Sequence, residues 1–198
     1  QRTDQDRYAT ATTGRSLERA DVSANDFHVK GSAQKGLGRA RLEFGVDVNG
    51  RYGLEALDTI QAYDLSGNLT HDTSNLSIEN AHRTDVGAFL QAETFVLPVL
   101  RLSAGLRGDR VTTRNTGGYF GDRATSNGAL SGFAAGTVGP LSGLSLTAQV
   151  SRGFRDPALS DRYFRGPSGR GFITGNPDLE PETSLQFDLS ARYTLART

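Results

Sequence analysis

The most regular feature of this chain is an alternation of apolar and polar residues with a period of two. In residues 144–151 the even positions are Leu, Leu, Ala and Val, and the odd positions are Ser, Thr, Gln and Ser. This alternation is typical of a β-strand with one apolar and one polar face. It recurs clearly in Arg41–Asn49, Leu100–Arg107, Leu144–Ser151 and Leu185–Thr194.

Weaker versions of the pattern predict further strands. Asp85–Val96 alternates except at Phe89 and Phe95, which fall on its polar side. Gly128–Val138 is rich in small residues, and Asp6–Thr13 and Val22–Gly31 alternate poorly. We expect about eight strands in all, and no helix.

The connections between these strands alternate in length. The short ones are Gln34–Gly38, Leu97–Val99 and Gly139–Gly143, and the long ones are Gly50–His82, Thr113–Asn127 and Gly153–Thr183. When every second connection is long, an up-and-down antiparallel meander places all the long ones at one end. The last is beyond the usual length of a hairpin loop and rich in Arg, Gly, Pro and aromatic residues, which indicates a functional loop.

Alternation alone does not say whether the apolar face meets lipid or a protein core, so a soluble β-sandwich remains an alternative. Three features favour a transmembrane β-barrel. The strand patterns reach the ~9–11 residues that cross a bilayer when tilted. Their polar faces carry Arg, Asp, Glu and Gln, as a hydrated lumen would, and the loop lengths are asymmetric between the two ends.

Composition narrows the function. The 198 residues carry 22 Lys plus Arg and 22 Asp plus Glu, and this neutrality argues against a nucleic-acid-binding protein. With no Cys, disulfides and thiol chemistry are excluded. With no Met, a processed protein or a fragment is expected. No apolar run approaches the length of a membrane helix, and no signal peptide is recognisable.

No enzyme motif is present. The chain lacks a nucleophile elbow, a phosphate-binding loop, a zinc-protease helix motif and a dinucleotide fingerprint. Its three histidines, His28, His71 and His82, have no metal-motif spacing. We therefore expect no catalytic residue, no cofactor, no metal site and no enzyme activity.

Two motifs in the last long loop carry a family resemblance. One is Ser151-Arg152-Gly153-Phe154-Arg155-Asp156-Pro157, and the other is Gly175-Asn176-Pro177-Asp178-Leu179-Glu180-Pro181-Glu182. Their order and spacing resemble the barrel of TonB-dependent outer-membrane receptors, in which GFR-x-P ends a strand and GNP-x-L-x-PE leads into the next. The resemblance extends over roughly residues 84–198.

The resemblance implies a 22-stranded barrel of the bacterial outer membrane, filled by a plug domain and energised by the TonB complex. We expect residues 1–198 to be one partial barrel domain of about eight strands, without the plug domain and the barrel C-terminus. The expected partners are the TonB complex (through the plug), outer-membrane lipid and a small-molecule ligand, with no nucleic acid.

The long loop supplies the candidate site residues. Before position 176 it holds five arginines against two aspartates, interleaved with aromatic side chains. Such a surface suits an anionic, aromatic ligand such as a ferric catecholate. The substrate-binding candidates are Arg162, Tyr163, Arg165, Arg170 and Phe172. For the motif residues Gly153, Phe154, Arg155, Pro157, Gly175, Asn176, Pro177, Leu179, Pro181 and Glu182 we favour a structural role in shaping the loop base.

A ferric siderophore is the ligand we expect, imported after capture at the extracellular loops. Cobalamin, saccharides and peptides stay open. Haem receptors of the family carry a His between the two motifs, and residues 155–176 contain none, which disfavours haem. The alternatives to a transporter are a soluble β-sandwich ligand-binding module and a plug-less outer-membrane barrel acting as an enzyme or adhesin.

Overall fold

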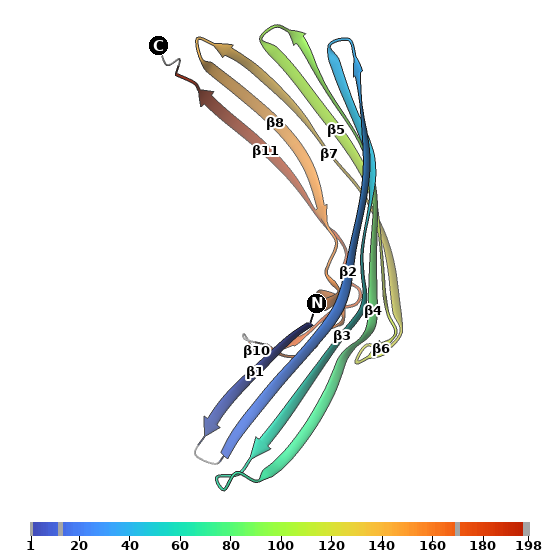
Figure 1. Ribbon diagram of the computed structural model, residues 1–198, viewed down its shortest axis with the longest axis vertical. Helices are drawn as coiled ribbons and strands as arrows, with labels where there is room; N and C mark the ends of the chain where they lie inside the picture. The colour runs from blue at the N-terminus through green and yellow to red at the C-terminus, as the bar shows by residue number, and fades with distance from the viewer. Residues whose placement is uncertain (1, 12–13, 169–170, 196–198) are drawn as a thin grey trace.

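The computed structural model describes residues 2–11, 14–168 and 171–195, with side chains from Ala9 onward. Within them the chain forms one nine-stranded antiparallel sheet, in which the long strands pair in sequence order (Figure 1). Its strands are β1 (Arg2–Ala11), β2 (Gly14–Leu37), β3 (Ala40–Tyr63), β4 (Leu69–Leu97), β5 (Leu100–Asn115), β6 (Gly117–Gly118), β7 (Arg123–Leu141), β8 (Leu144–Arg155) and β11 (Glu182–Tyr193). The expected all-β, up-and-down meander is confirmed.

The connection between β8 and β11 adds three small elements. They are the helix α1 (Leu159–Tyr163) and a separate two-stranded sheet of β9 (Arg165–Ser168) and β10 (Gly171–Thr174). The expectation of no helix was therefore wrong by one short turn. No helix in the described residues is long and apolar enough to cross a membrane.

The two ends of the sheet differ. Three tight turns, between β2 and β3, β4 and β5, and β7 and β8, gather at one end, called here the turn end (Figure 1). The β3–β4 and β5–β7 connections lie toward the other end, called the loop end (Figure 1). The β8–β11 connection folds inward, toward the middle of the sheet (Figure 1). Pro98 lies in the short connection expected at Leu97–Val99.

The prediction of a long loop at Gly50–His82 was wrong. β3 and β4 continue through most of it and meet in a short turn, where the Asp64 amide donates to the Asn68 carbonyl at 2.9 Å. The loop expected at Thr113–Asn127 is also mostly strand, because β5 runs to Asn115 and β7 starts at Arg123. Thr113–Asn127 is mostly polar, and in Gly50–His82 the apolar residues do not keep a period of two across the register shifts of β3 and β4. Neither segment therefore shows the alternation.

The weak strand predictions fall inside longer strands. Asp85–Val96, Gly128–Val138 and Val22–Gly31 lie within β4, β7 and β2. Asp6–Thr13 overlaps β1, and its last two residues lie outside the described residues. β2 and β3 have 24 residues each and β4 has 29. At about 3.3 Å per residue, each is about 80 Å or longer, well over the ~30 Å of a bilayer's hydrocarbon core.

Apolar residues are more exposed than polar ones in the half of the sheet near the turn end. On β5, Leu106 is 64% exposed, whereas its polar neighbour Arg107 on the other face is half-buried. On β8, Leu146 is 52% exposed between two half-buried polar residues. A protein that folds in water shows the opposite bias, so this convex face is suited to lipid.

This apolar band ends partway along the strands. On β5 the exposed positions change from Leu102, Ala104 and Leu106 to Arg110, Thr112 and Arg114 beyond Gly108. A charged residue at that depth marks the passage from hydrocarbon into the polar region, because charge on a lipid face is costly. The loop end therefore lies in water.

Bulges turn the sheet where it leaves the apolar band. The pairing of β3 with β4 shifts between Arg51 and Leu54, next to Gly53 with a φ of 61°. The shift changes which residues face inward: Asp47 is buried before it, and Leu54 and Ala56 after it. Figure 1 shows β2, β3 and β4 bending at this level. The inward apolar residues beyond the bulge form the floor on which the last loop packs.

Candidate functional site

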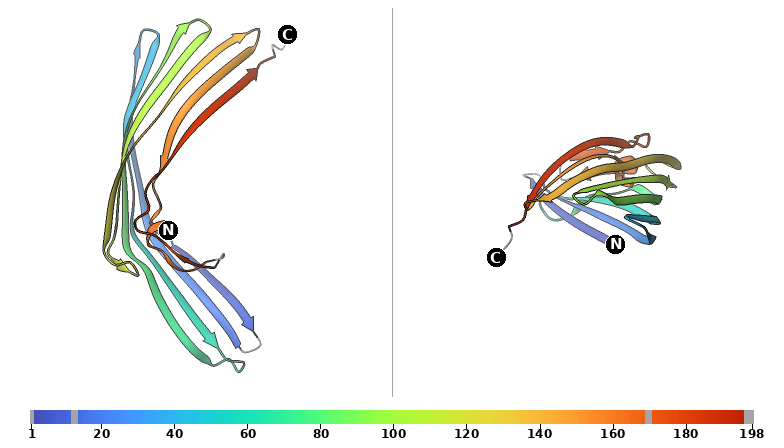
Figure 2. Two further views of the ribbon diagram at one scale, coloured as in Figure 1. Left: turned by 180° about the vertical axis from the view of Figure 1, so that it is seen from behind. Right: turned by 90° about the horizontal axis from the view of Figure 1, so that it is seen from above.

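The β8–β11 connection folds back into the concave side of the curved sheet (Figure 2). Leu159 and Tyr163 of α1 are 3% and 0% exposed, and they form one cluster with inward residues of β2, β3 and β4. The wall residues of this cluster are Ala24, Leu54, Ala56, Ile78 and Ala81. Burial of these apolar side chains fixes the loop to the wall of the sheet.

The two sequence motifs meet at the base of the loop. Arg155 pairs with Glu182 across β8 and β11, and its guanidinium lies 3.7 Å from the Glu182 carboxylate and 3.2 Å from that of Asp161. The Arg162 guanidinium donates to the Pro177 carbonyl at 2.8 Å. A Cβ on Gly175 would lie 2.8 Å from the Arg162 carbonyl, so only glycine fits there. These contacts agree with the structural role favoured for the motifs.

Asp156 anchors the loop to the wall. Its side chain is fully buried; the Asn127 amide on β7 donates to it at 2.7 Å, and the Arg83 and Arg162 guanidinium groups lie 3.5 Å away. Arg83, on β4, also donates to the Pro157 carbonyl at 2.8 Å. A buried carboxylate needs such partners, because an unpaired charge is costly in a protein interior. The anchor therefore joins β4, β7 and α1.

Two of the predicted ligand contacts lie in the core. Arg162 is 1% exposed and Tyr163 is 0% exposed, and the Tyr163 hydroxyl lies 3.3 Å from the Thr113 hydroxyl on β5. In this conformation neither side chain is open to a ligand, and both support the loop instead. Their burial follows from α1, which the sequence pattern did not predict. Arg170 lies outside the described residues.

The other two candidates are brought together on the surface. The Arg165 guanidinium lies 4.2 Å from the centre of the Tyr119 ring and 5.0 Å from that of Phe172. Tyr119 is 53% exposed and Phe172 is 62% exposed, so both rings reach solvent. These distances are those of cation–π contacts. Tyr119 comes from the β5–β7 connection and was missed, although an aromatic pair in a glycine-rich segment was a usable signal.

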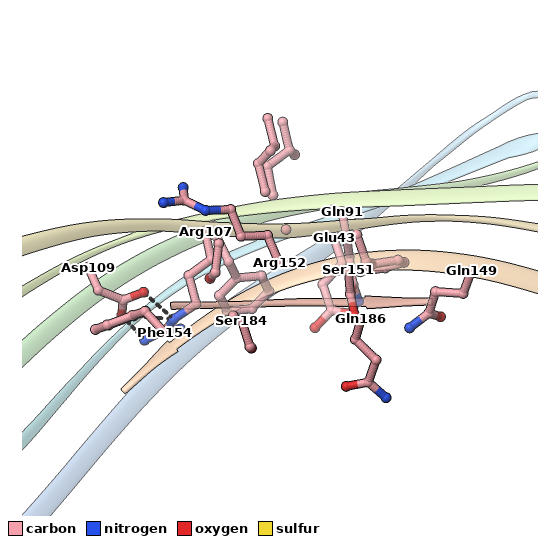
Figure 3. Close-up of a pocket in the computed structure, with 18 of the residues that line it drawn as sticks. Glu43, Gln91, Arg107, Asp109, Gln149, Ser151, Arg152, Phe154, Ser184 and Gln186 are labelled. Carbon is pink, nitrogen blue, oxygen red and sulfur yellow. Dashed lines mark hydrogen bonds and ion pairs between the residues drawn. The ribbon is translucent and has the colours of Figure 1, made fainter. Parts of the chain in front are cut away.

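A hollow lies on the concave face nearer the apolar band. It has a volume of about 800 Å³ and is lined by residues of β2, β3, β4, β5, β7, β8 and β11, many of them polar or aromatic (Figure 3). Arg107 is one of the lining residues, and it is bonded to Asp109 on the same strand and to Asp47 on β3. Polar residues facing inward and apolar residues facing outward are the arrangement expected for a barrel wall around a hydrated lumen.

The charged groups at the loop end include a carboxyl group with one unsatisfied oxygen. Asp58 on β3 is 5% exposed, and one of its oxygens accepts no hydrogen bond. Burial, reinforced by the nearby Glu18 carboxylate, raises the pKa of Asp58 above its ordinary value. Among the described residues, no group of three His, Asp or Glu side chains is arranged to hold a metal ion.

Comparison with known proteins shows which family shares this architecture. The family model described as TonB dependent receptor-like, beta-barrel, matches residues 1–198. Two curated proteins named iron-regulated outer membrane virulence protein, both from Vibrio cholerae serotype O1, are 32% identical over 130 residues, which is 64% of this chain and 18% of theirs. The chain thus spans about a fifth of the length of these relatives.

Solved structures share the fold at low sequence identity. The copper transporter OprC superposes with a TM-score of 0.67 at 20% identity, covering 91% of this chain and 28% of OprC. The ferric citrate transporter FecA, in its unliganded form, gives 0.62 at 13% identity, covering 97% of this chain and 28% of FecA. At such identities the likeness shows the fold alone.

The family match decides between the alternatives that the strand pattern left open. It excludes the soluble β-sandwich, and an outward apolar band agrees with a barrel of the outer membrane. It also agrees with the expectation of no enzyme activity, because the family is one of receptors. The chain belongs to the TonB-dependent receptor family and forms part of its β-barrel in the bacterial outer membrane.

Proposed function

We propose that the complete receptor captures a ferric siderophore at its loop end and imports it with energy from the TonB complex. In this proposal residues 1–198 form part of the barrel, and a plug domain encoded elsewhere in the protein fills the lumen and contacts TonB. The name of the Vibrio cholerae relatives supports an iron-linked role, and the siderophore receptor PiuA from Acinetobacter baumannii shares the fold with a TM-score of 0.52.

The observation that carries the proposal is the position of Arg165 between two exposed aromatic rings. Tyr119, Arg165 and Phe172, called here the aromatic–arginine cluster, come from two different connections, β5–β7 and β8–β11, which lie beyond the apolar band. A guanidinium group can bond an anionic oxygen through its edge while its face stays on a ring. The rings can stack on a planar aromatic group. This combination suits an iron chelate with anionic, aromatic ligands.

Arg162 and Tyr163 act indirectly in this proposal. Both are buried in α1, directly before the strand that carries Arg165, and they hold that strand at the wall. We therefore regard them as positioning residues and not as ligand contacts. Arg170 stays a candidate contact from its place in the sequence.

The test is ligand binding by the full-length receptor with single substitutions in the cluster. Tyr119→Ala, Arg165→Ala and Phe172→Ala should each weaken the binding of a ferric catecholate about tenfold, which corresponds to about 1.4 kcal/mol. Losses of that size are typical of cation–π and aromatic contacts. Arg101→Ala is the matched control, because Arg101 is an exposed arginine at the turn end, paired with Glu93 at 3.6 Å.

Transport is tested separately from binding. Uptake of the ferric chelate by whole cells should need both the receptor and a functional TonB complex. If the cluster variants bind and transport as well as the unaltered receptor, the assigned ligand-contact role is wrong. If uptake proceeds equally without TonB, the barrel is a passive pore and the transport proposal fails.

A further inference from the structure

Asp58 is a buried carboxyl group that no part of the ligand-binding proposal uses. It lies on the inward face of β3 beyond the bulge, is 5% exposed, and has one oxygen with no hydrogen-bond partner. Asn75 is its register partner on β4, and the Asn75 amide donates to the Arg165 carbonyl at 3.0 Å and not to Asp58. An ionised carboxylate in this position would be buried without compensation, which is unfavourable.

The β9–β10 hairpin covers this carboxyl group. Gly166 of β9 is buried against it, and a Cβ added to Gly166 would collide with the Asp58 carboxylate. The same hypothetical Cβ would lie 3.0 Å from the Phe164 ring, so the site is closed on that side too. The hairpin therefore contacts the rest of the protein at Asp58, at Asn75 and at the Tyr119 ring.

Among the side chains that the structure describes, no cationic group contacts Asp58. Glu18 on β2 lies close enough to disfavour its ionisation, and Arg7 of β1 is the register partner of Glu18. The Arg165 guanidinium is directed onto Tyr119 and Phe172.

The other charged groups described near Asp58 lie on the far face of the sheet or have other partners. His71 of β4 shares the inward face four register pairs further along, where its imidazole bonds the Thr73 hydroxyl at 2.6 Å. Arg19 and Asp72 fall on the opposite face, and Arg162 of α1 is engaged by Pro177 and Asp156.

We propose that Asp58 is a protonation-controlled seat for the β9–β10 hairpin. With the carboxyl group neutral, the hairpin lies against the wall and holds the aromatic–arginine cluster together. Ionisation favours release of the hairpin, because the charged carboxylate can be hydrated only after the hairpin has left the wall. The proposal goes beyond ligand capture and holds for any ligand.

The direction of the pH dependence follows from this arrangement. Burial raises the pKa of Asp58 in the seated state above the value in the released, hydrated state. A raised carboxyl pKa favours the seated state at low pH, and that advantage is lost as the pH rises through the raised value. Release should therefore begin near the ordinary aspartate pKa of about 3.9 and finish above it.

The experiment is a distance measurement between two spin labels in the full-length receptor. These 198 residues contain no cysteine, so cysteines introduced at Thr174 on β10 and Ser66 in the β3–β4 turn are unique within them. The label distance should change with pH in the unaltered sequence. In Asp58→Asn, which mimics the neutral acid, the distance should stay at its low-pH value throughout. Asp72→Asn, in the same β3–β4 hairpin as Asp58 but on its opposite, exposed face, is the control and should behave as the unaltered protein.

Two further variants make the result specific. Glu18→Gln should lower the midpoint of the transition without abolishing it. Gly166→Ala should release the hairpin even at low pH, and adding Asp58→Gly should restore the seated distance by removing the collision. A pH transition that persists in Asp58→Asn, or a distance that does not change with pH, overturns the proposal. Suppression of the transition by EDTA would also overturn it, because it would assign a bound cation to the carboxyl group.

Discussion

The guanidinium of Arg107 on β5 reaches the Asp47 carboxylate on β3, two strands away, by crossing over Gly87 on β4. The two nitrogens of Arg107 lie 2.5 and 2.8 Å from the two carboxylate oxygens, and its third nitrogen bonds Asp109 at 2.8 Å. A Cβ on Gly87 would collide with the guanidinium. One side chain thus joins three consecutive strands on the concave face of the barrel wall.

Arg107→Ala should lower the free energy of unfolding by about 1–3 kcal/mol, because it leaves the buried Asp47 without its charged partner. Arg107→Lys should recover only part of this loss, because an ammonium group cannot bond two carboxylates as a planar guanidinium does. The measurement is the unfolding of the folded receptor in detergent by denaturant. Arg101→Ala is the control: its pair with Glu93 is exposed on both sides, and its loss should cost less than ~1 kcal/mol.

Gly87→Ala tests the same contact from the other side. The added methyl group displaces Arg107, so the variant should lose about as much stability as Arg107→Ala, and the double variant should lose less than the sum. Gly31→Ala on β2 is the matched control, because a Cβ there meets no atom within 4 Å. Additive losses in the double variant would contradict the crossing contact.

Gly175→Ala should disorder the base of the β8–β11 loop while the barrel stays folded. The new Cβ would lie 2.8 Å from the Arg162 carbonyl carbon and oxygen, and backbone atoms cannot move aside as a flexible side chain can. We expect a local cost of about 1–3 kcal/mol. Limited proteolysis should cut within residues 156–181 more readily, while resistance of the barrel to heat in detergent is unchanged. Equal resistance of the loop to protease in both proteins would show that the close approach is not needed.

Substitutions at Tyr163 test whether this side chain is a core residue or a ligand contact. Tyr163→Ala removes a fully buried ring and should destabilise the docked loop by about 3–5 kcal/mol. Tyr163→Phe loses only the contact with the Thr113 hydroxyl, at about 1 kcal/mol. Hydrogen exchange of the α1 amides measures both. If Tyr163→Phe abolished ligand binding and left exchange unchanged, the hydroxyl would contact the ligand, as the sequence first indicated.

The β3–β4 turn should depend on pH through Asp64. Hydrogen bonds from the Asn68 side chain and amide lower the pKa of Asp64 below its ordinary value. Because the pKa of Asp64 is lowered, its ionised form stabilises the turn at any pH above the ordinary aspartate pKa. This stabilisation is lost as the pH falls through the lowered pKa. The protection factor of the Asn68 amide should therefore fall only below pH ~3.9.

Asp64→Ala should remove this protection at every pH. Asp72→Asn, on the same hairpin, should leave it unchanged. A protection factor that decreases on raising the pH from 4 to 7 would contradict the assignment.

The sequence by itself determined the strands wherever one face meets lipid and the other meets water. In Leu144–Ser151 the contrast between the two environments imposes a strict period of two, and β8 forms there. The paired motifs of the last loop, Gly153–Arg155 and Gly175–Glu182, likewise indicated the family by resemblance, and Gly175 is required by its close approach to the Arg162 carbonyl.

Only the tertiary structure decided what happens beyond the apolar band. There the outward face of β3 and β4 meets water, and the inward face is covered by the last loop, which packs on it only in the folded protein. Gly50–His82 therefore carries no period-two signal although it is mostly strand. The bulge beside Gly53 changes which residues face inward, and no local pattern specifies that change. Burial of Arg162 and Tyr163 depends on α1 packing against residues more than 80 positions away in sequence, such as Ala56 and Ile78. The contact of Tyr119 with Arg165 has the same origin, because it joins two connections that meet only after the sheet has curved.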